Sequence, residues 1–269
     1  MKHKTDDKKT EMKYIMSLSG GVASAVAAER AIKRYGRENV TLWFADTKWE
    51  DEDLYRFLDD LMKRWGGELI TYTDGRTPLQ VSIDAKIIPN SFAAPCTFKL
   101  KIKPFMDYVK SHDKPLTVML GIDWSEIHRI EAPKRNYEKI EGVTVDYPLL
   151  WKPYEFRNYH EVVRSWSIET PRLYNMGFSH NNCGGRCFKQ GLGSWRILDY
   201  HFPERYDEVM VFEEWSREQG GPRADRSICK NQSKYAESKE LTLRELREAN
   251  DPIEGQPVQE DIFSCMCGW

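Results

Sequence analysis

A glycine-rich segment near the amino end has the residue types that bind phosphate. Residues 17–24 read Ser-Leu-Ser-Gly-Gly-Val-Ala-Ser and connect an apolar run, residues 14–18, to an alanine-rich stretch, residues 22–34. Consecutive glycines let a backbone approach a ligand closely, and the amides at the start of a helix attract anions. The serine hydroxyls add hydrogen-bond donors. Because no lysine follows the glycines, the segment differs from the P-loop of nucleoside triphosphatases.

Cysteines form a second group of residues that could take part in chemistry, since four of the six occur as two close pairs. Cys183 and Cys187 are four positions apart, and we expect Cys183 to begin the helix that follows it. Cys265 and Cys267 would point to one side of an extended chain. Four thiolates suit Zn²⁺ or a [4Fe–4S] cluster, and the spacings do not decide between these two. Two unrelated pairs of reduced thiols are the alternative. The remaining cysteines, Cys96 and Cys229, are single.

Charged side chains form two further groups. Lys99, Lys101 and Lys103 alternate along the chain and could neutralise a phosphate or sulfate, although solvated surface lysines are the alternative. Glu126 and Arg129 are three positions apart, so they share one face of a helix. An ion pair between them is as consistent with this spacing as a role at an anion.

The segments that must position these residues alternate between strand-like and helix-like patterns. Five short apolar runs predict strands at residues 14–18, 40–45, 68–72, 116–120 and 143–145. Helical patterns occupy residues 22–34, 51–65, 154–166, 190–198, 203–219 and 241–249, and residues 220–240 look irregular. This alternation predicts an α/β fold, with a parallel sheet covered by helices on both faces. Ligands bind beyond the carboxyl ends of such strands, where Ser19, Asp46 and Gly121 occur.

Composition narrows the class of protein. Lys plus Arg number 40 against 42 for Asp plus Glu, a net charge of −2, which argues against a surface built for non-specific nucleic-acid binding. No apolar run approaches the roughly 18–20 residues of a membrane span, so we expect no membrane association. Residues 1–13 contain no apolar stretch of a secretion signal, and we expect a cytoplasmic protein. We divide the chain into a flexible arm (1–13), an α/β domain (14–170) and a helical, Cys-rich region packed on it (171–269).

The order strand, Ser-Gly-Gly-x-x-Ser, helix resembles the PP-loop of the adenine-nucleotide alpha-hydrolase superfamily. Later segments resemble motifs of its phosphoadenosine phosphosulfate (PAPS) reductase-like family, including phage-type members, in the family's order. These segments are residues 46–52, 96–104, 121–129, 147–151 and 171–183. Ala23 is a departure, because the family's pyrophosphatases carry Asp at this position. The resemblance then implies that Asp46, Asp123 or Glu126 takes over the role of that Asp.

The resemblance implies a Rossmann-like PP-loop fold and an enzyme that binds ATP, or a related adenine nucleotide, with Mg²⁺. Residues implied to contact the nucleotide are Ser17, Ser19, Gly20, Gly21, Val22, Ala23, Ser24, Ala45, Asp46, Thr47, Gly121 and Ile122. Residues implied to take part in catalysis are Asp46, Lys99, Lys103, Glu126 and Arg129.

The activity implied is cleavage of ATP at the α-phosphate, which adenylates an acceptor. Cysteines that hold a cluster would extend this to sulfur transfer onto a tRNA or DNA acceptor, with sulfur from a donor protein. One alternative is a PAPS or adenylyl-sulfate reductase that releases sulfite, because the Cys267-Gly268 step resembles the family's catalytic cysteine motif. The other is a non-catalytic nucleotide-binding module with a structural metal. An oligomer is compatible with all three.

Overall fold

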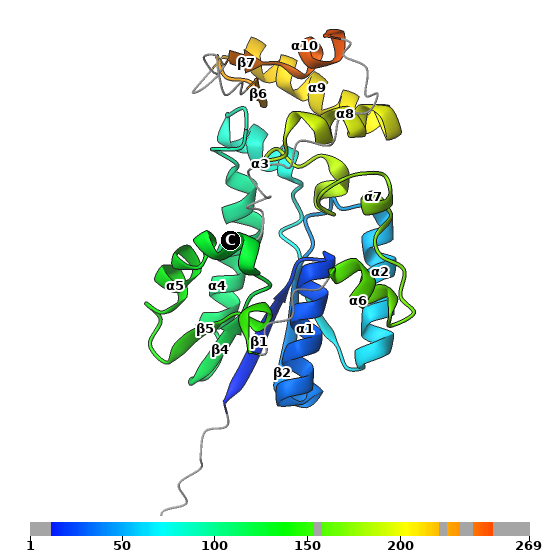
Figure 1. The fold of residues 1–269 in the computed structure, drawn as a ribbon. Helices are drawn as coiled ribbons and strands as arrows, with labels where there is room; N and C mark the ends of the chain where they lie inside the picture. Colours follow the sequence, from blue (N-terminus) through cyan, green and yellow to red (C-terminus); the bar gives the residue numbers. More distant parts are fainter. Residues whose placement is uncertain (1–11, 153–157, 221–224, 232–238, 250–269) are drawn as a thin grey trace, which may run out of the picture.

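A single parallel sheet organises the first part of the molecule. The structure is a computed structural model that describes residues 12–152, 158–220, 225–231 and 239–249. Its five strands lie in the order β3-β2-β1-β4-β5 (Figure 1). They are β1 (Lys13–Leu18), β2 (Val40–Ala45), β3 (Leu69–Tyr72), β4 (Leu116–Met119) and β5 (Val143–Asp146). All five predicted strands are present, and the α/β class is confirmed.

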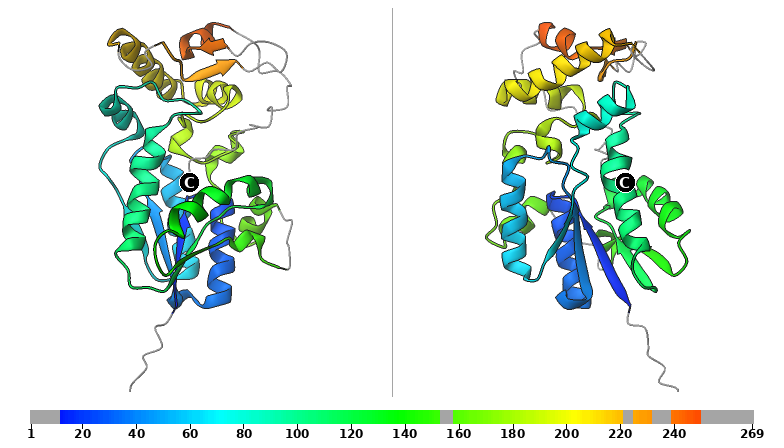
Figure 2. Two further views of the ribbon diagram at one scale, coloured as in Figure 1. Left: turned by 90° about the vertical axis from the view of Figure 1, so that its left-hand side faces the viewer. Right: turned by 180° about the vertical axis from the view of Figure 1, so that it is seen from behind.

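Helices cover both faces of this sheet, as Figure 2 shows. One face carries α1 (Val22–Tyr35), α2 (Glu52–Trp65) and α6 (Tyr159–Arg164), and the other carries α4 (Lys103–Lys110) and α5 (Glu131–Tyr137). Successive residues of a strand point to opposite faces. Accordingly, Met16 packs with α1 and α2, whereas Ile15 packs with Trp43 and Phe105 on the α4 side.

A third apolar core lies beyond the carboxyl ends of the strands, in the upper part of Figure 1. Its helices are α3 (Pro78–Ala85), α7 (Arg172–Asn175), α8 (Leu192–His201), α9 (Pro203–Glu218) and α10 (Leu243–Glu248). Short helical turns connect the other elements: η1 (Arg37–Asn39), η2 (Thr97–Ile102), η3 (Trp124–Arg129), η4 (Pro148–Leu150) and η5 (Cys183–Gly185). The core joins Trp49, Ile88 and Leu100 to α8, α9 and α10. The domain boundary near residue 170 stays a prediction.

The C-terminal region departs from the sequence prediction at two places. Residues 220–240 are not wholly irregular, because β6 (Cys229–Asn231) and β7 (Lys239–Leu241) form an antiparallel pair. The buried carboxylate of Glu213 accepts the N–H groups of Ile228 and Leu243, both at 2.7 Å, and so ties this pair and α10 to α9. Burial raises the pKa of Glu213 to about 7.

Cys183 does not begin a long helix. It opens the short turn η5, where Cys183, Gly184 and Gly185 all have positive φ, and α8 begins at Leu192. Consecutive positive φ values cannot continue a right-handed helix. The predicted arm is shorter than expected, because residue 13 belongs to β1, and residues 1–11 lie outside the described residues. No helix within the described ranges is long and apolar enough to cross a membrane.

Candidate functional site

The glycine-rich loop between β1 and α1 is held in shape by its own side chains. Ser24 Oγ donates to the carbonyl of Gly21 at 2.8 Å and accepts from Ser19 Oγ at 3.0 Å and Ser19 N–H at 3.2 Å. Gly20 has φ +79°, and a Cβ there would lie 2.7 Å from Leu54 Cδ1. Position 20 therefore needs glycine both for its conformation and for its packing against α2.

The amino end of α1 presents its backbone amides without a side-chain cap. Gly21 occupies the N-cap position and has no side chain to cap the first amides, and the first turn carries no acidic residue. The first amides of a helix have no partner within the helix, and the helix dipole gives them positive character. This end of α1 is therefore suited to an anion.

A cavity of about 460 Å³, here called the main cavity, opens at this end of α1. It lies beside the carboxyl ends of β1, β2 and β4, where the strand order changes direction. Ligands of open α/β sheets bind at this position, and the volume falls within the range of small-molecule sites. The residues implied for nucleotide contact that line it are Ser17, Ser19, Gly21, Val22, Ala23, Ser24, Ala45, Gly121 and Ile122.

Asp46 lies next to the main cavity but is not among its lining residues. Its Oδ1 accepts the Tyr55 hydroxyl and the Lys48 N–H, both at 2.8 Å, and its Oδ2 lies 2.8 Å from Lys48 Nζ. Burial alone would raise the pKa of Asp46, but these hydrogen bonds outweigh it and hold the pKa below its usual range. The Asp46 carboxylate thus stabilises the turn that follows β2. Gly20 and Thr47 also fall outside the lining residues.

Glu126 and Arg129 both line the main cavity and form an ion pair with each other. Asp123 joins them, and its Oδ1 accepts the N–H of Ser125 at 2.8 Å. The site therefore contains two carboxylates and a guanidinium on the η3 segment.

The lysine at the main cavity is Lys101, whose Nζ lies 3.6 Å from Glu50 Oε1. Lys99 and Lys103, the lysines implied for catalysis, are exposed and do not line this cavity. Lys103 pairs with Asp107. The segment is helical, so residues two positions apart lie on opposite sides.

A wall of the main cavity comes from residues 158–160 and 174–182. The His160 ring stands edge-on to the ring of Tyr174, with centroids 4.6 Å apart. Burial, and then the charge of Arg164, lowers the pKa of His160, which favours the neutral imidazole. Residues 174–182 belong to the segment 171–183, which resembles a family motif, but neither they nor residues 158–160 were predicted to contact the nucleotide.

Three cysteines line a second, smaller cavity of about 10 Å³, here called the thiol cavity. They are Cys96, Cys183 and Cys187, and the thiol cavity shares Lys101 with the main cavity. Glu50 holds this region together, since it accepts the Cys183 N–H at 2.5 Å. Sequence spacing did not reveal Cys96 as a member of this group, because folding brings it close from a distant segment.

The metal site predicted on Cys183, Cys187, Cys265 and Cys267 stays a prediction. No group of three or more His, Cys, Asp or Glu side chains in the described part of the chain is arranged to hold a metal ion. Cys265 and Cys267 lie outside the described residues. No chemical step is therefore assigned to zinc or a cluster.

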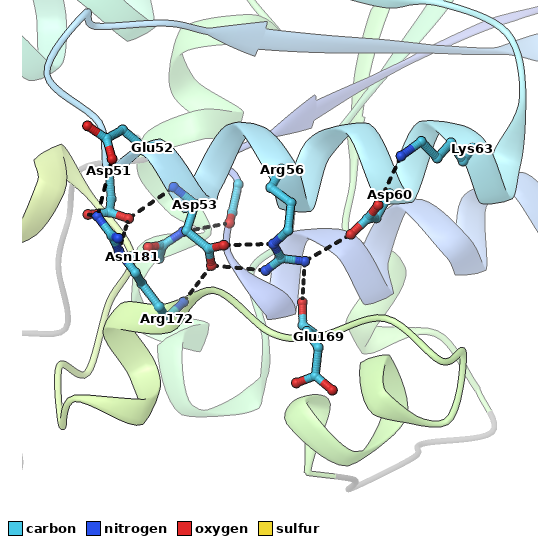
Figure 3. Close-up of polar contacts among 10 residues, drawn as sticks. Asp51, Glu52, Asp53, Arg56, Asp60, Lys63, Glu169, Arg172 and Asn181 are labelled. Carbon is cyan, nitrogen blue, oxygen red and sulfur yellow. Dashed lines mark hydrogen bonds and ion pairs between the residues drawn. The ribbon is translucent and has the colours of Figure 1, made fainter.

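An ionic network fixes the C-terminal region against the amino end of α2 (Figure 3). Asp51, whose side chain is fully buried, lies 2.8 Å from both Arg172 Nε and Arg205 Nη1. It also caps α2 by accepting the Asp53 N–H at 3.0 Å. Arg205 Nη1 donates to the Gly184 carbonyl at 3.0 Å. Asp51 therefore positions both the η5 turn and the segment that lines the main cavity.

Comparisons with known proteins found one matching family model and several similar solved structures. Residues 13–146 match the family model described as phosphoadenosine phosphosulfate reductase domain. Among solved structures, the chain is similar to phosphoadenylyl-sulfate (PAPS) reductase from Candida auris in a phosphate complex, with 14% identity and a TM-score of 0.44 over 64% of this chain and 82% of that one. It is also similar to the U34-tRNA thiolase NcsA from Methanococcus maripaludis with its [4Fe–4S] cluster, with 16% identity and a TM-score of 0.42 over 82% of this chain and 77% of that one. A search of curated proteins found no match. By this family model, residues 13–146 are a phosphoadenosine phosphosulfate reductase domain.

Proposed function

We propose that the chain is an enzyme that binds ATP in the main cavity and transfers adenylate to an acceptor, with release of pyrophosphate. The observation that carries this proposal is the uncapped amino end of α1, which meets a cavity of about 460 Å³ at the carboxyl edge of the sheet. Phosphoryl oxygens would accept hydrogen bonds from the amides of Gly21, Val22 and Ala23.

The charged lining residues suit the α-phosphate reaction. Arg129 and Lys101 would neutralise negative charge that develops as the bridging oxygen of pyrophosphate leaves. Mg²⁺ binds through one or two carboxylates together with phosphates and water, and Asp123 and Glu126 offer such oxygens in the cavity. When bound there, Mg²⁺ would neutralise phosphate charge. These two carboxylates would take over the role of the Asp that Ala23 replaces.

The reaction balances without a further reagent. A hydroxyl or amine of the acceptor attacks the α-phosphorus, the bond to the bridging oxygen breaks, and pyrophosphate leaves. The neutral imidazole of His160, which lines the same cavity, would accept the acceptor's proton. Three further features stay predictions: sulfur transfer to the adenylated group, a tRNA or DNA as the acceptor, and a protein that donates the sulfur.

The thiol cavity supports a second candidate, reduction of PAPS or adenylyl sulfate. In that reaction a cysteine thiolate attacks the sulfonyl sulfur and the nucleotide leaves. Attack by a second thiol on that cysteine then forms a disulfide and releases sulfite. Cys96, Cys183 and Cys187 are close to the main cavity through the shared Lys101. The candidate cysteine of the sequence analysis, Cys267, lies outside the described residues.

Two assays on the full chain separate the candidates. With ATP and Mg²⁺, we expect pyrophosphate release, with water or hydroxylamine as the acceptor. Lys101→Ala should lower kcat/KM about 10-fold to 100-fold, because a charge-assisted hydrogen bond contributes about 1.5–3 kcal/mol. The matched variant Lys99→Ala, which alters an exposed lysine of the same segment, should retain the wild-type value. Sulfite release from PAPS with reduced thioredoxin, without ATP turnover, would instead support the reductase. Binding of neither nucleotide would contradict both candidates.

A further inference from the structure

Asn181 is a buried polar residue in the wall of the main cavity. It lines the main cavity, whereas Cys183, two positions along, lines the thiol cavity. Its side chain is almost completely buried, at 2% exposure. Nδ2 donates to the Gly20 carbonyl at 3.3 Å, which joins Asn181 to the glycine-rich loop near the start of α2 (Figure 3). Its Oδ1 is buried and has no hydrogen-bond partner within the described residues.

The contact with Gly20 determines which end of the Asn181 amide remains without a partner. If the amide were flipped, Oδ1 would face the Gly20 carbonyl oxygen, and two acceptors would repel each other. Oδ1 is therefore an acceptor held in a fixed orientation. A buried acceptor without a donor is unfavourable, so such a group beside a binding cavity indicates a contact that a ligand completes.

The ligand group that completes this contact must be a hydrogen-bond donor. The phosphates of a nucleotide at neutral pH carry acceptors, so Oδ1 would repel them. The donors of an adenine nucleotide are its ribose hydroxyls and the amino group of its base. Asn181 is bonded to the loop proposed to hold the phosphates, and the ribose is attached directly to the α-phosphate, so we expect the ribose rather than the base to face Asn181. The amino group lies at the far end of the base.

On the basis of the proposed function, we propose that Asn181 is a specificity-determining residue whose Oδ1 accepts a hydrogen bond from a ribose hydroxyl of the bound nucleotide. A phosphate on that hydroxyl would place negative charge against a fixed acceptor. If the hydroxyl is the 3′ one, Asn181 selects ATP over PAPS, which carries a 3′-phosphate. The same residue would thus decide between the two candidate functions.

Calorimetric titration of the full chain with ATP, 2′-deoxy-ATP and 3′-deoxy-ATP tests this proposal. The wild type should bind one deoxy analogue about threefold to tenfold more weakly than ATP, the size of one lost hydrogen bond, and this analogue identifies the hydroxyl. Asn181→Ala should bind all three nucleotides with equal affinity. Asn182→Ala, which alters the neighbouring cavity residue, should keep the wild-type discrimination whatever its affinity for ATP. Asn181→Leu, of similar volume, replaces Asn181→Ala if the smaller side chain destabilises the fold.

The outcomes separate this proposal from the proposed function. Tight binding of ATP with equal binding of both deoxy analogues would overturn the role of Asn181 and leave the ATP site standing. If the Asn181 variants still bind one deoxy analogue more weakly than ATP, the role of Asn181 is likewise overturned and the ATP site stands. Failure of the wild type to bind ATP would overturn both.

Discussion

Replacement of Gly21 by valine is expected to lower the affinity for ATP about 100-fold and to leave the thermal stability close to that of the wild type. Gly21 lines the main cavity with φ −95°, a conformation that any residue adopts. A Cβ there would meet the Tyr174 hydroxyl at 3.0 Å and Ser19 Oγ at 3.7 Å, both at the ends of side chains. The valine would block access to the α1 amides, and loss of two charge-assisted hydrogen bonds corresponds to about 3 kcal/mol. Titration calorimetry and thermal unfolding measure the two quantities.

Gly20→Val is the matched control for this prediction. Position 20 has positive φ, and the new Cβ would lie 2.7 Å from Leu54, so this variant should lose stability as well as affinity. The packing of Leu54 therefore makes glycine necessary for the fold at position 20. Wild-type affinity for ATP in Gly21→Val would show that the phosphates bind elsewhere.

Asp51→Asn is expected to lower the free energy of unfolding by about 3 kcal/mol. The substitution keeps the shape and the N-cap oxygen but removes a fully buried charge that faces Arg172 and Arg205. Removal of one partner from a buried ion pair typically costs 3–5 kcal/mol, and the low end applies because Arg172 is 38% exposed. Hydrogen exchange should increase most in the segment around Arg172 and Gly184. Affinity for ATP should fall as well, because this segment forms a wall of the main cavity.

The loss of stability caused by Asp51→Asn should depend on pH and should be smaller in acid. Burial would raise the pKa of Asp51, but hydrogen bonds from Arg172 and Arg205 outweigh it and hold the pKa below the ordinary value of 3.8. A lowered pKa in the folded state contributes stability above that ordinary value, and the contribution disappears as the pH falls through the folded pKa. The difference between wild type and Asp51→Asn should therefore shrink below about pH 4. Asp59→Asn, at an exposed pair with Lys63, should change stability by less than about 0.5 kcal/mol at any pH. Equal effects of the two substitutions would contradict the role assigned to Asp51.

The sheet was predictable because buried parallel strands are short, continuous apolar runs. β2 coincides with the predicted run of residues 40–45. Because helices cover both faces of the sheet, both sides of this strand are apolar, and the strand is a continuous apolar run in the sequence. Order along the chain then placed the glycine-rich loop at the carboxyl edge of β1 and so predicted where a ligand site would lie. The short strands β6 and β7 have no comparable run, since two three-residue strands depend on tertiary contacts such as those of Glu213.

The roles of individual side chains were less predictable, because they depend on which way each one points. The spacing of Lys99, Lys101 and Lys103 did not show which of them faces a cavity, and the helical segment places Lys101 at the main cavity. Asp46 follows β2 as expected, but Tyr55 from α2 engages its carboxylate. Both outcomes depend on contacts between distant elements, which local spacing does not encode.

The amide resonances of the α1 amino end give the most direct test of the central claim, that backbone amides at Gly21, Val22 and Ala23 bind the phosphates of an adenine nucleotide. Nitrogen-15 labelled full chain is titrated with ATP and, separately, with adenosine, which lacks phosphates. We predict large shifts of the Val22 and Ala23 amides with ATP and small shifts with adenosine. Saturable ATP binding that leaves these amides unshifted would contradict the account.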